Sequence, residues 1–344
     1  MAQHIFFANK GRAPDRPLRR AGGEWGVALG GGVCSIDGAM AWFSFSPEDF
    51  SYAFLSVLME GVPFILLGTL LSGVIDQFLP SRMMTRYLPR NAFLGICASA
   101  AMGAVFPMCE CGVVPVIRRL IAKGLPVSNA VAYMLAAPVV NPIVALSTYA
   151  AFRGQGAAEF VALRLGLSYA VAVIVALAVL NLPLGAVLKR SVLASAALDP
   201  DAGGGRGGPL GLRLAAAMHT GIRDFLDVMV YFIFGVAVSS LFSTAVNQAL
   251  IVPLALNDWL AVASLMGIAG VLSLCSTSDA FIAATFVAFP GVAKLAFMVF
   301  GPMMDLKLLF IYSAVFTKRF VIGLAVGLFV LIGLLCVRLS ILGL

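Results

Sequence analysis

Long apolar runs constrain the fold of this chain more than any other feature. The run from Ala157 to Leu188 exceeds the roughly 20 residues that a helix needs to cross the hydrocarbon core of a bilayer. Over its 344 residues the chain is 61% hydrophobic and only 11% charged. We therefore predict an all-α polytopic membrane protein, with the lipid bilayer as its main partner.

Two polar, glycine-rich segments interrupt this pattern. Residues 1–45 carry five Lys and Arg side chains and no continuous apolar stretch, which argues against a cleaved signal peptide and indicates a disordered tail. Residues 189–217 contain Asp199, Pro200 and Asp201 followed by a glycine run, a composition typical of a flexible linker, which we expect to be cytoplasmic. Two transmembrane segments remain, residues 46–188 and 218–344.

Landmarks recur at nearly constant spacing in these two segments. They are an acidic residue in the first helix, a cysteine, and an amide or acid three residues after a proline. The aligned pairs are Glu60 with Asp227, Cys109 with Cys275, and Asn141 with Asp305, at offsets of 167, 166 and 164. We predict two structural repeats, each with a long helix, two broken segments around the cysteine and the proline, and a final uninterrupted helix.

The segment Phe-Pro-Met-Cys-Glu-Cys-Gly at residues 106–112 lies between hydrophobic stretches long enough to bring it to the membrane midplane. A carboxylate at that depth is energetically expensive, so Glu110 is a functional candidate. Residues i and i+2 of a helix point about 200° apart, so Cys109 and Cys111 can act together only if the helix is broken. The flanking prolines and glycine favour a break. Broken helices at this depth persist where they line a cavity or are buried in protein.

The basic residues indicate whether the broken cysteine segments cross the bilayer. If residues 91–123 form a re-entrant hairpin, most Lys and Arg side chains fall on one side, which the positive-inside rule makes cytoplasmic. Each half then has an odd number of full spans, so the second half enters from the opposite face. We therefore predict two inverted repeats whose broken or re-entrant helices meet at the midplane, as in many secondary transporters. The basic side contains Arg82, Arg86, Arg90, Arg118, Arg119, Lys123, Lys189, Arg190, Arg206, Arg213, Lys318 and Arg319, and the opposite side mainly Arg153, Lys294 and Arg338.

Three segments together resemble a known family. Residues 106–112, the segment Ala-Ala-Pro-Val-Val-Asn-Pro at 136–142, and Gly-Pro-Met-Met-Asp at 301–305 are similar to the bacterial predicted-permease family that includes organoarsenical efflux permeases and proposed copper or zinc exporters. The resemblance runs from about Ser46 to the C-terminus. It implies a multi-pass exporter of the bacterial inner membrane.

The thiols are the strongest candidates for binding a solute. Cys109 and Cys111 are soft ligands suited to trivalent arsenic, Cu(I) or Zn(II), and Cys275 repeats Cys109 in the second half. We regard a metal bound by these three cysteines as transported substrate only. The alternative is that Cys109 and Cys111 are small packing residues at a helix break.

Three further polar residues are candidates for the substrate site. Asn141 and Asp305 lie in the matching breaks of the two halves, and Asp279 follows Cys275 by four positions. The alternative for Asn141 and Asp305 is local hydrogen bonding to the turn. Lys307 would then serve only to neutralise Asp305.

The remaining acidic candidates have two interpretations each. Glu110 either caps the N-terminus of a half-helix or exchanges protons with the substrate. Glu60 and Asp227 occupy equivalent positions in the first helix of each half. They are candidates for a proton relay, or they lie at an interfacial helix end or in a structural ion pair.

The chain lacks the common enzyme signatures. It contains neither a G-x-x-x-x-G-K-[ST] phosphate loop nor an H-E-x-x-H zinc motif, so we expect no enzymatic activity and no cofactor. Coupling to an ion gradient is the simpler inference. The net charge of +7 is spread over loops, which predicts no nucleic-acid partner. The sequence leaves the oligomeric state open, a homo-oligomer included.

Three functions are consistent with these residues. The first is a secondary efflux transporter for a soft, thiol-seeking solute such as a trivalent organoarsenical or a soft metal ion. The second is a permease for a sulfur-containing anion such as thiosulfate. The third is a membrane thiol oxidoreductase using Cys109 and Cys111, although redox pairs usually have two intervening residues and this pair has one.

Overall fold

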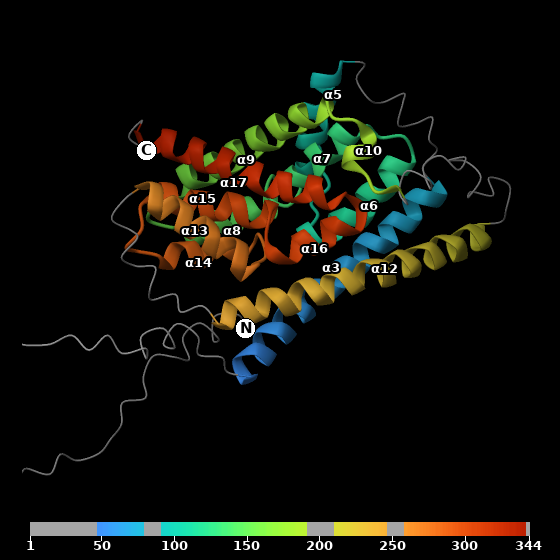
Figure 1. The fold of residues 1–344 in the computed structure, drawn as a ribbon, viewed down its shortest axis with the longest axis horizontal. Helices are drawn as coiled ribbons and strands as arrows, with labels where there is room; N and C mark the ends of the chain where they lie inside the picture. Colours follow the sequence, from blue (N-terminus) through green and yellow to red (C-terminus); the bar gives the residue numbers. More distant parts are fainter. Residues whose placement is uncertain (1–46, 79–90, 191–209, 246–257, 342–344) are drawn as a thin grey trace, which may run out of the picture.

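The computed structural model describes residues 47–78, 91–190, 210–245 and 258–341 (Figure 1). In these ranges the regular structure is helical, with one isolated bridge between Leu188 and Phe316. Five stretches are long and apolar enough to cross a membrane. The prediction of an all-α membrane protein is confirmed. The expected N-terminal tail and most of the expected linker lie outside the described residues.

Four long helices correspond to the long apolar runs. They are α3 (Pro47–Phe78), α9 (Ala157–Leu180), α12 (Leu210–Ala245) and α17 (Lys318–Ile341). The α12 helix begins at Leu210, so residues 210–217, which the sequence analysis assigns to the linker, are helical. Leucines and alanines fill this stretch, and both favour helix strongly enough to extend α12 beyond its central apolar run.

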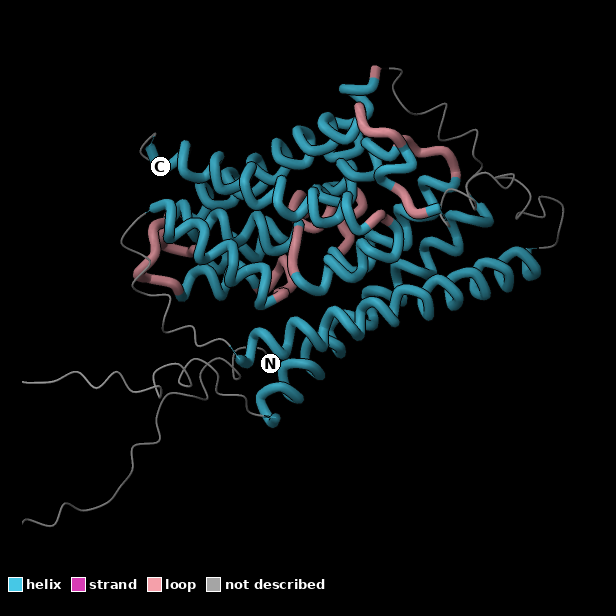
Figure 2. Tube along the Cα trace, viewed as in Figure 1, coloured by secondary structure: helices cyan, strands magenta, loops and turns pink. Residues whose placement is uncertain are grey.

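The other helices are too short to cross a bilayer on their own, which takes roughly 20 residues. Apart from the single turns η1 and α10, they contain between 7 and 15 residues. In chain order they are α5 (Ala92–Ala101), η1 (Met102–Ala104), α6 (Glu110–Ala122), α7 (Val127–Ala136), α8 (Pro142–Ala151), α10 (Leu184–Val187), α13 (Asp258–Leu272), α14 (Asp279–Thr285), α15 (Gly291–Met303) and α16 (Leu306–Val315). Figure 2 shows that some of the non-helical connections lie in the middle of the molecule, not only at its ends.

The same order of elements occurs twice. Before the undescribed residues 191–209 the chain runs from α3 through the short pairs α5–α6 and α7–α8 to α9. After them it runs from α12 through α13–α14 and α15–α16 to α17.

The helices α3 and α12 form an antiparallel pair along one side of the molecule (Figure 1), which we call the arm pair. Glycines bring the two backbones together: a Cβ atom added at Gly73 would lie 2.1 Å from the carbonyl oxygen of Ala217, and one at Gly61 would lie 2.2 Å from the Phe232 ring. Because small residues permit such close approach, they are common at helix contacts in membranes.

The remaining helices form the core. All of α7 and nearly all of α15 are buried at its centre. The arm pair packs on this core chiefly through α6 and α16. The breaks that precede α6 and α16 therefore lie where the arm pair meets the core.

Candidate functional site

The first helix break separates η1 from α6. Cys109 has extended backbone, with φ −73° and ψ 161°, and its sulfur accepts a hydrogen bond from the Gly112 N–H at 3.4 Å, so Cys109 caps α6. The helix begins at Glu110. Cys111 is therefore already helical, although both thiols were predicted to lie in broken backbone. Because Cys109 precedes the helix, the 200° rule does not apply, and both cysteines line one pocket.

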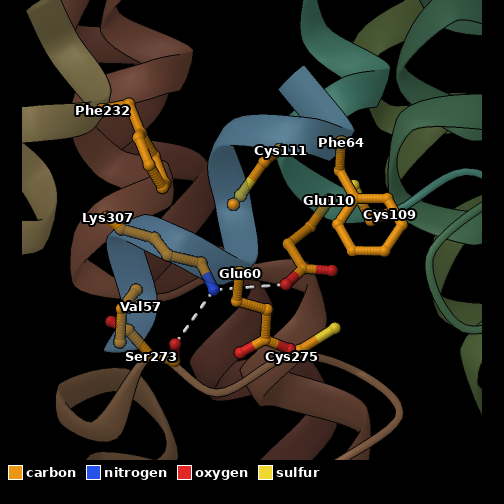
Figure 3. A pocket seen from close by; sticks show the side chains of 11 residues that line it. Val57, Glu60, Phe64, Cys109, Glu110, Cys111, Phe232, Ser273, Cys275 and Lys307 are labelled. Carbon is orange, nitrogen blue, oxygen red and sulfur yellow. Dashed lines mark hydrogen bonds and ion pairs between the residues drawn. The ribbon is translucent and has the colours of Figure 1, made fainter. Parts of the chain in front are cut away.

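The pocket lies between the arm pair and the core, is partly open to the outside, and has a cavity volume of about 20 Å³, room for about one water molecule (Figure 3). Its lining combines three thiols, two carboxylates, one ammonium group and aromatic rings. The arm pair contributes Val57, Glu60, Gly61, Phe64 and Phe232, and the core contributes Cys109, Glu110, Cys111, Ser273, Cys275 and Lys307. The first and second halves of the chain therefore each supply cysteine to the same space.

A buried charge cluster forms part of the pocket wall, where Figure 3 shows Lys307 paired with Glu110. The Lys307 ammonium lies 3.2 Å from Glu110 Oε1 and 3.4 Å from Asp305 Oδ2, and it donates to the Ser273 carbonyl at 2.9 Å. The three charged side chains are at most 4% exposed. Glu110 Oε2 and Asp305 Oδ2 have no hydrogen-bond partner. Two carboxylates and one ammonium leave this cluster with a deficit of positive charge if all three are ionised.

The connection between Lys307 and Glu110 spans 197 residues and was not predicted. From the sequence, Lys307 was expected only to neutralise Asp305. Ser273 follows the end of α13 with φ 49°, an unusual value for a residue other than glycine, and in this conformation its carbonyl meets Lys307. No pattern in the sequence reveals either feature.

Asn141 and Asp305 cap the helices that follow their breaks. Asn141 Oδ1 accepts from the Ile143 N–H at 2.9 Å, and Asp305 Oδ1 accepts from the Leu308 N–H at 2.7 Å. Neither residue lines the pocket. Asp305 nevertheless reaches it indirectly through its ion pair with Lys307, whereas the Asn141 side chain has only its capping bond among the residues that the structure describes.

Asp279 lies in a different buried ion pair. Its carboxylate receives two hydrogen bonds from Arg164 of α9, at 2.8 and 2.9 Å, and the two side chains are 2% and 1% exposed. Arg164 also donates to the Ser276 carbonyl and to the Thr148 hydroxyl. The pair ties α9 to the start of α14 outside the pocket lining. Arg164 was missed, although a charged residue within a long apolar run is the signal that could have found it.

The equivalent residues Glu60 and Asp227 have different surroundings. Glu60 lines the pocket from α3. Asp227 lies outside the pocket lining, 3.5 Å from Arg118 on α6, with its side chain 56% exposed. Only Glu60 is therefore placed to exchange a proton directly with the pocket.

The thiols are reduced and do not form a ready-made metal site. Cys109, Cys111 and Cys275 are free, as are Cys97 and Cys336, which lie outside the pocket lining. Within the described ranges, no three His, Cys, Asp or Glu side chains converge closely enough to hold a metal ion. A solute that binds all three pocket thiols must therefore draw them together.

Comparison with known proteins bears on the family and the membrane location of the chain. Residues 48–340 match the family described as "Predicted permease". The chain belongs to this family. It is a multi-pass protein of the bacterial inner membrane, and the resemblance noted from its motifs is confirmed.

Two relatives align with this permease over most of their length. One is "UPF0718 protein YcgR" of Bacillus subtilis (strain 168), 39% identical over 272 residues, which are 78% of this chain and 89% of the relative. The other is the "Putative two-component membrane permease complex subunit" of Streptococcus mutans serotype c (strain ATCC 700610 / UA159), 34% identical over 271 residues, 78% of this chain and 87% of the relative. No solved structure matches the permease.

Proposed function

We propose that this permease is a secondary efflux transporter for a soft, thiol-seeking solute, either a trivalent organoarsenical or a soft metal ion. The observation that carries the proposal is the meeting of Cys109, Cys111 and Cys275 at one pocket between the arm pair and the core. Thiolate sulfur prefers soft acceptors. Because the three cysteines come from both halves of the chain, a solute bound to all of them links the two halves.

The charges around the thiols favour a cationic or neutral solute over an anion. Glu110 and Asp305 oppose a single Lys307 that both already engage, and Glu60 adds a further carboxylate to the lining. An anion such as thiosulfate would have to approach these carboxylates in a medium where charge repulsion is poorly screened. This observation disfavours the sulfur-anion alternative.

The proposal includes two inverted repeats with re-entrant cysteine hairpins. The repeated order of helices supports it, as do the short lengths of α5, α6, α13 and α14. Two reciprocal contacts are also consistent with the repeat, since α6 packs on α16 and α14 packs on α8. In this arrangement the solute site forms where broken helices of the two repeats meet. Such a protein moves its solute without chemical conversion, so we propose that it is not an enzyme.

Everted membrane vesicles test the proposal. Vesicles with the parent protein should accumulate phenylarsine oxide or Cu(I), but not thiosulfate. Cys109→Ser, Cys111→Ser and Cys275→Ser should each reduce accumulation toward the level of vesicles without the permease, because a hydroxyl is a poor soft-metal ligand. Cys336→Ser is the matched control, since Cys336 is buried in α17 away from the pocket.

The opposite pattern would contradict the thiol mechanism. Asp305→Asn should be milder than the pocket-cysteine variants, because Asn141 already caps the equivalent helix in the first half. If the cysteine variants transport as well as the parent while Asp305→Asn is inactive, the carboxylates are the better candidates for the substrate site.

A further inference from the structure

A second charge cluster crosses the boundary between the arm pair and the core. The end of α6 and the residue that follows it carry three basic side chains, which face three aspartates on the arm pair. The closest contacts join Arg119 to Asp224 through two hydrogen bonds, at 2.9 and 3.0 Å. Around them lie Arg118 with Asp227 at 3.5 Å, Arg119 with Asp76 at 3.7 Å and Lys123 with Asp76 at 3.8 Å. We call these six residues the α6 ion-pair cluster.

The centre of this cluster is built as an interior contact, not as a surface salt bridge. The Asp224 side chain is 3% exposed and also accepts a hydrogen bond from the Ser72 hydroxyl. The Arg119–Asp224 contact has the bidentate geometry in which a guanidinium and a carboxylate bind most strongly. Surface pairs contribute little to stability, but a hydrogen-bonded pair around a buried carboxylate contributes more.

The cluster lies on the helix that carries Cys111, nearer to its C-terminal end. Arg119 follows Cys111 by eight residues on the same helix, which at 1.5 Å per residue places it about 12 Å farther along α6. The same end of the arm pair contains the C-terminus of α3 and the N-terminus of α12. The positive-inside rule assigns this basic end to the cytoplasm.

The packing of the arm pair on the core does not follow the repeated order of elements. In the repeated order of elements, α14 takes the place of α6, and α8 takes the place of α16. The arm pair packs closely on α6 and α16, whereas α12 has no comparable packing on α14, nor α3 on α8. A second arrangement in which the arm pair moves away from α6 could exchange these contacts for the equivalent ones on α14 and α8.

We propose that the α6 ion-pair cluster is the cytoplasmic gate of the permease, and that the arm pair must separate from α6 to open the pocket to the cytoplasm. The role of a gate rests on the proposed transport function. The separation of the arm pair from α6 can be measured without transport. In the described arrangement the cluster holds α6 against the arm pair, and each ion pair that breaks shifts the permease toward the cytoplasm-open arrangement.

Accessibility of a pocket thiol tests the gate without measuring transport. Cys275 is kept as the sole cysteine, and everted vesicles are treated with a membrane-impermeant maleimide. Asp224→Asn and Arg119→Gln should each raise the labelling rate by about tenfold, because each removes a hydrogen-bonded charge pair that holds the closed arrangement. Asp227→Asn removes a more exposed partner and should have a smaller effect.

The matched control is Arg213→Gln. Arg213 donates to the Gln77 carbonyl and lies over the Phe78 ring, so it joins α12 to α3 within the arm pair and not to the core. Its labelling rate should equal that of the parent. Thermal unfolding in detergent identifies variants that remain folded.

Unchanged labelling in folded Asp224→Asn and Arg119→Gln proteins would overturn the gate, as would an equal increase in Arg213→Gln. Either result leaves the vesicle transport test of the thiols intact. Conversely, a failure of thiol-dependent transport leaves the labelling result interpretable, so the two proposals can fail separately.

Discussion

At the scale of single residues, Lys307 is the cation that pairs with both buried carboxylates beside the pocket. Its ammonium lies between two carboxylates that are almost completely buried. A buried charge is tolerated only when it is paired and hydrogen-bonded, so neither Glu110 nor Asp305 would be stable at this depth without Lys307.

Lys307→Met should therefore destabilise the protein by about 3–5 kcal/mol, the cost of breaking a buried ion pair by removing one partner. The measurement is thermal unfolding of the purified protein in detergent. Combining Lys307→Met with Glu110→Gln and Asp305→Asn removes the opposing charges and should recover most of the loss. If Lys307→Met alone unfolds at the parent temperature, the charge cluster does not stabilise the site.

The sequence identified the chemistry of individual residues better than their connections. Cys109 and Cys111 were recognisable because thiols beside helix-breaking residues are unusual in a membrane segment, and Cys275 because it repeats Cys109 in the second half. The link from Lys307 to Glu110 depends on how α16 packs against α6, and no local pattern encodes that contact. The sequence likewise suggested that Asp279 lies near the substrate, because no local pattern reveals its ion pair with Arg164.

At the scale of helices, glycines set how closely the arm pair approaches the core. A Cβ atom at Gly68 of α3 would lie 2.4 Å from the carbonyl oxygen and 2.8 Å from the Cα atom of Gly112 on α6. Both are backbone atoms, which cannot rotate away as a side chain could. The contact therefore requires glycine, or a displacement of α3 from the pocket.

Gly68→Ala should lower the unfolding temperature, because overpacking of this kind costs about 1–3 kcal/mol. Gly166→Ala on α9 is the matched control, since nothing lies within 4 Å of its added Cβ. Alanine favours helix over glycine by roughly 0.5–1 kcal/mol, so the control should be neutral or stabilising. Equal unfolding temperatures for Gly68→Ala and the parent would show that the α3–α6 contact is less tight than described.

The long helices could be predicted closely because a membrane span depends mainly on the length of its apolar run. The bounds of α3 and α17 follow the hydrophobic stretches, whereas α9 ends at Leu180 and not at the end of its apolar run at Leu188. Pro183, which has no N–H to continue the helical hydrogen bonds, lies between α9 and the separate turn α10. The start of α12 was missed because residues 210–217 continue the helix beyond the apolar run. The position of the first break was also missed by two residues, since capping of α6 by Cys109 leaves Cys111 inside the helix.

At the scale of the whole molecule, the proposed topology places the basic ends of α6 and α10 on one face of the membrane. Lys123 follows α6 and Lys189 follows α10. In a background without other cysteines, Lys123→Cys and Lys189→Cys should therefore both be labelled by a membrane-impermeant maleimide faster in everted vesicles than in intact cells. Arg153→Cys, at a position that follows α8, is the reference for the opposite face and should be labelled faster in intact cells. Labelling of positions 123 and 189 from opposite faces would remove the re-entrant hairpin and with it the inverted repeat.

The most direct test of the thiol pocket is protection of its cysteines by the solute. Purified permease is incubated with phenylarsine oxide, alkylated with iodoacetamide under native conditions, and analysed by mass spectrometry for each cysteine. Our account predicts that the arsenical protects Cys109, Cys111 and Cys275 together, while alkylation of Cys97 and Cys336 is unchanged. Protection that is absent at the three pocket cysteines, or that appears equally at Cys97 and Cys336, would contradict it.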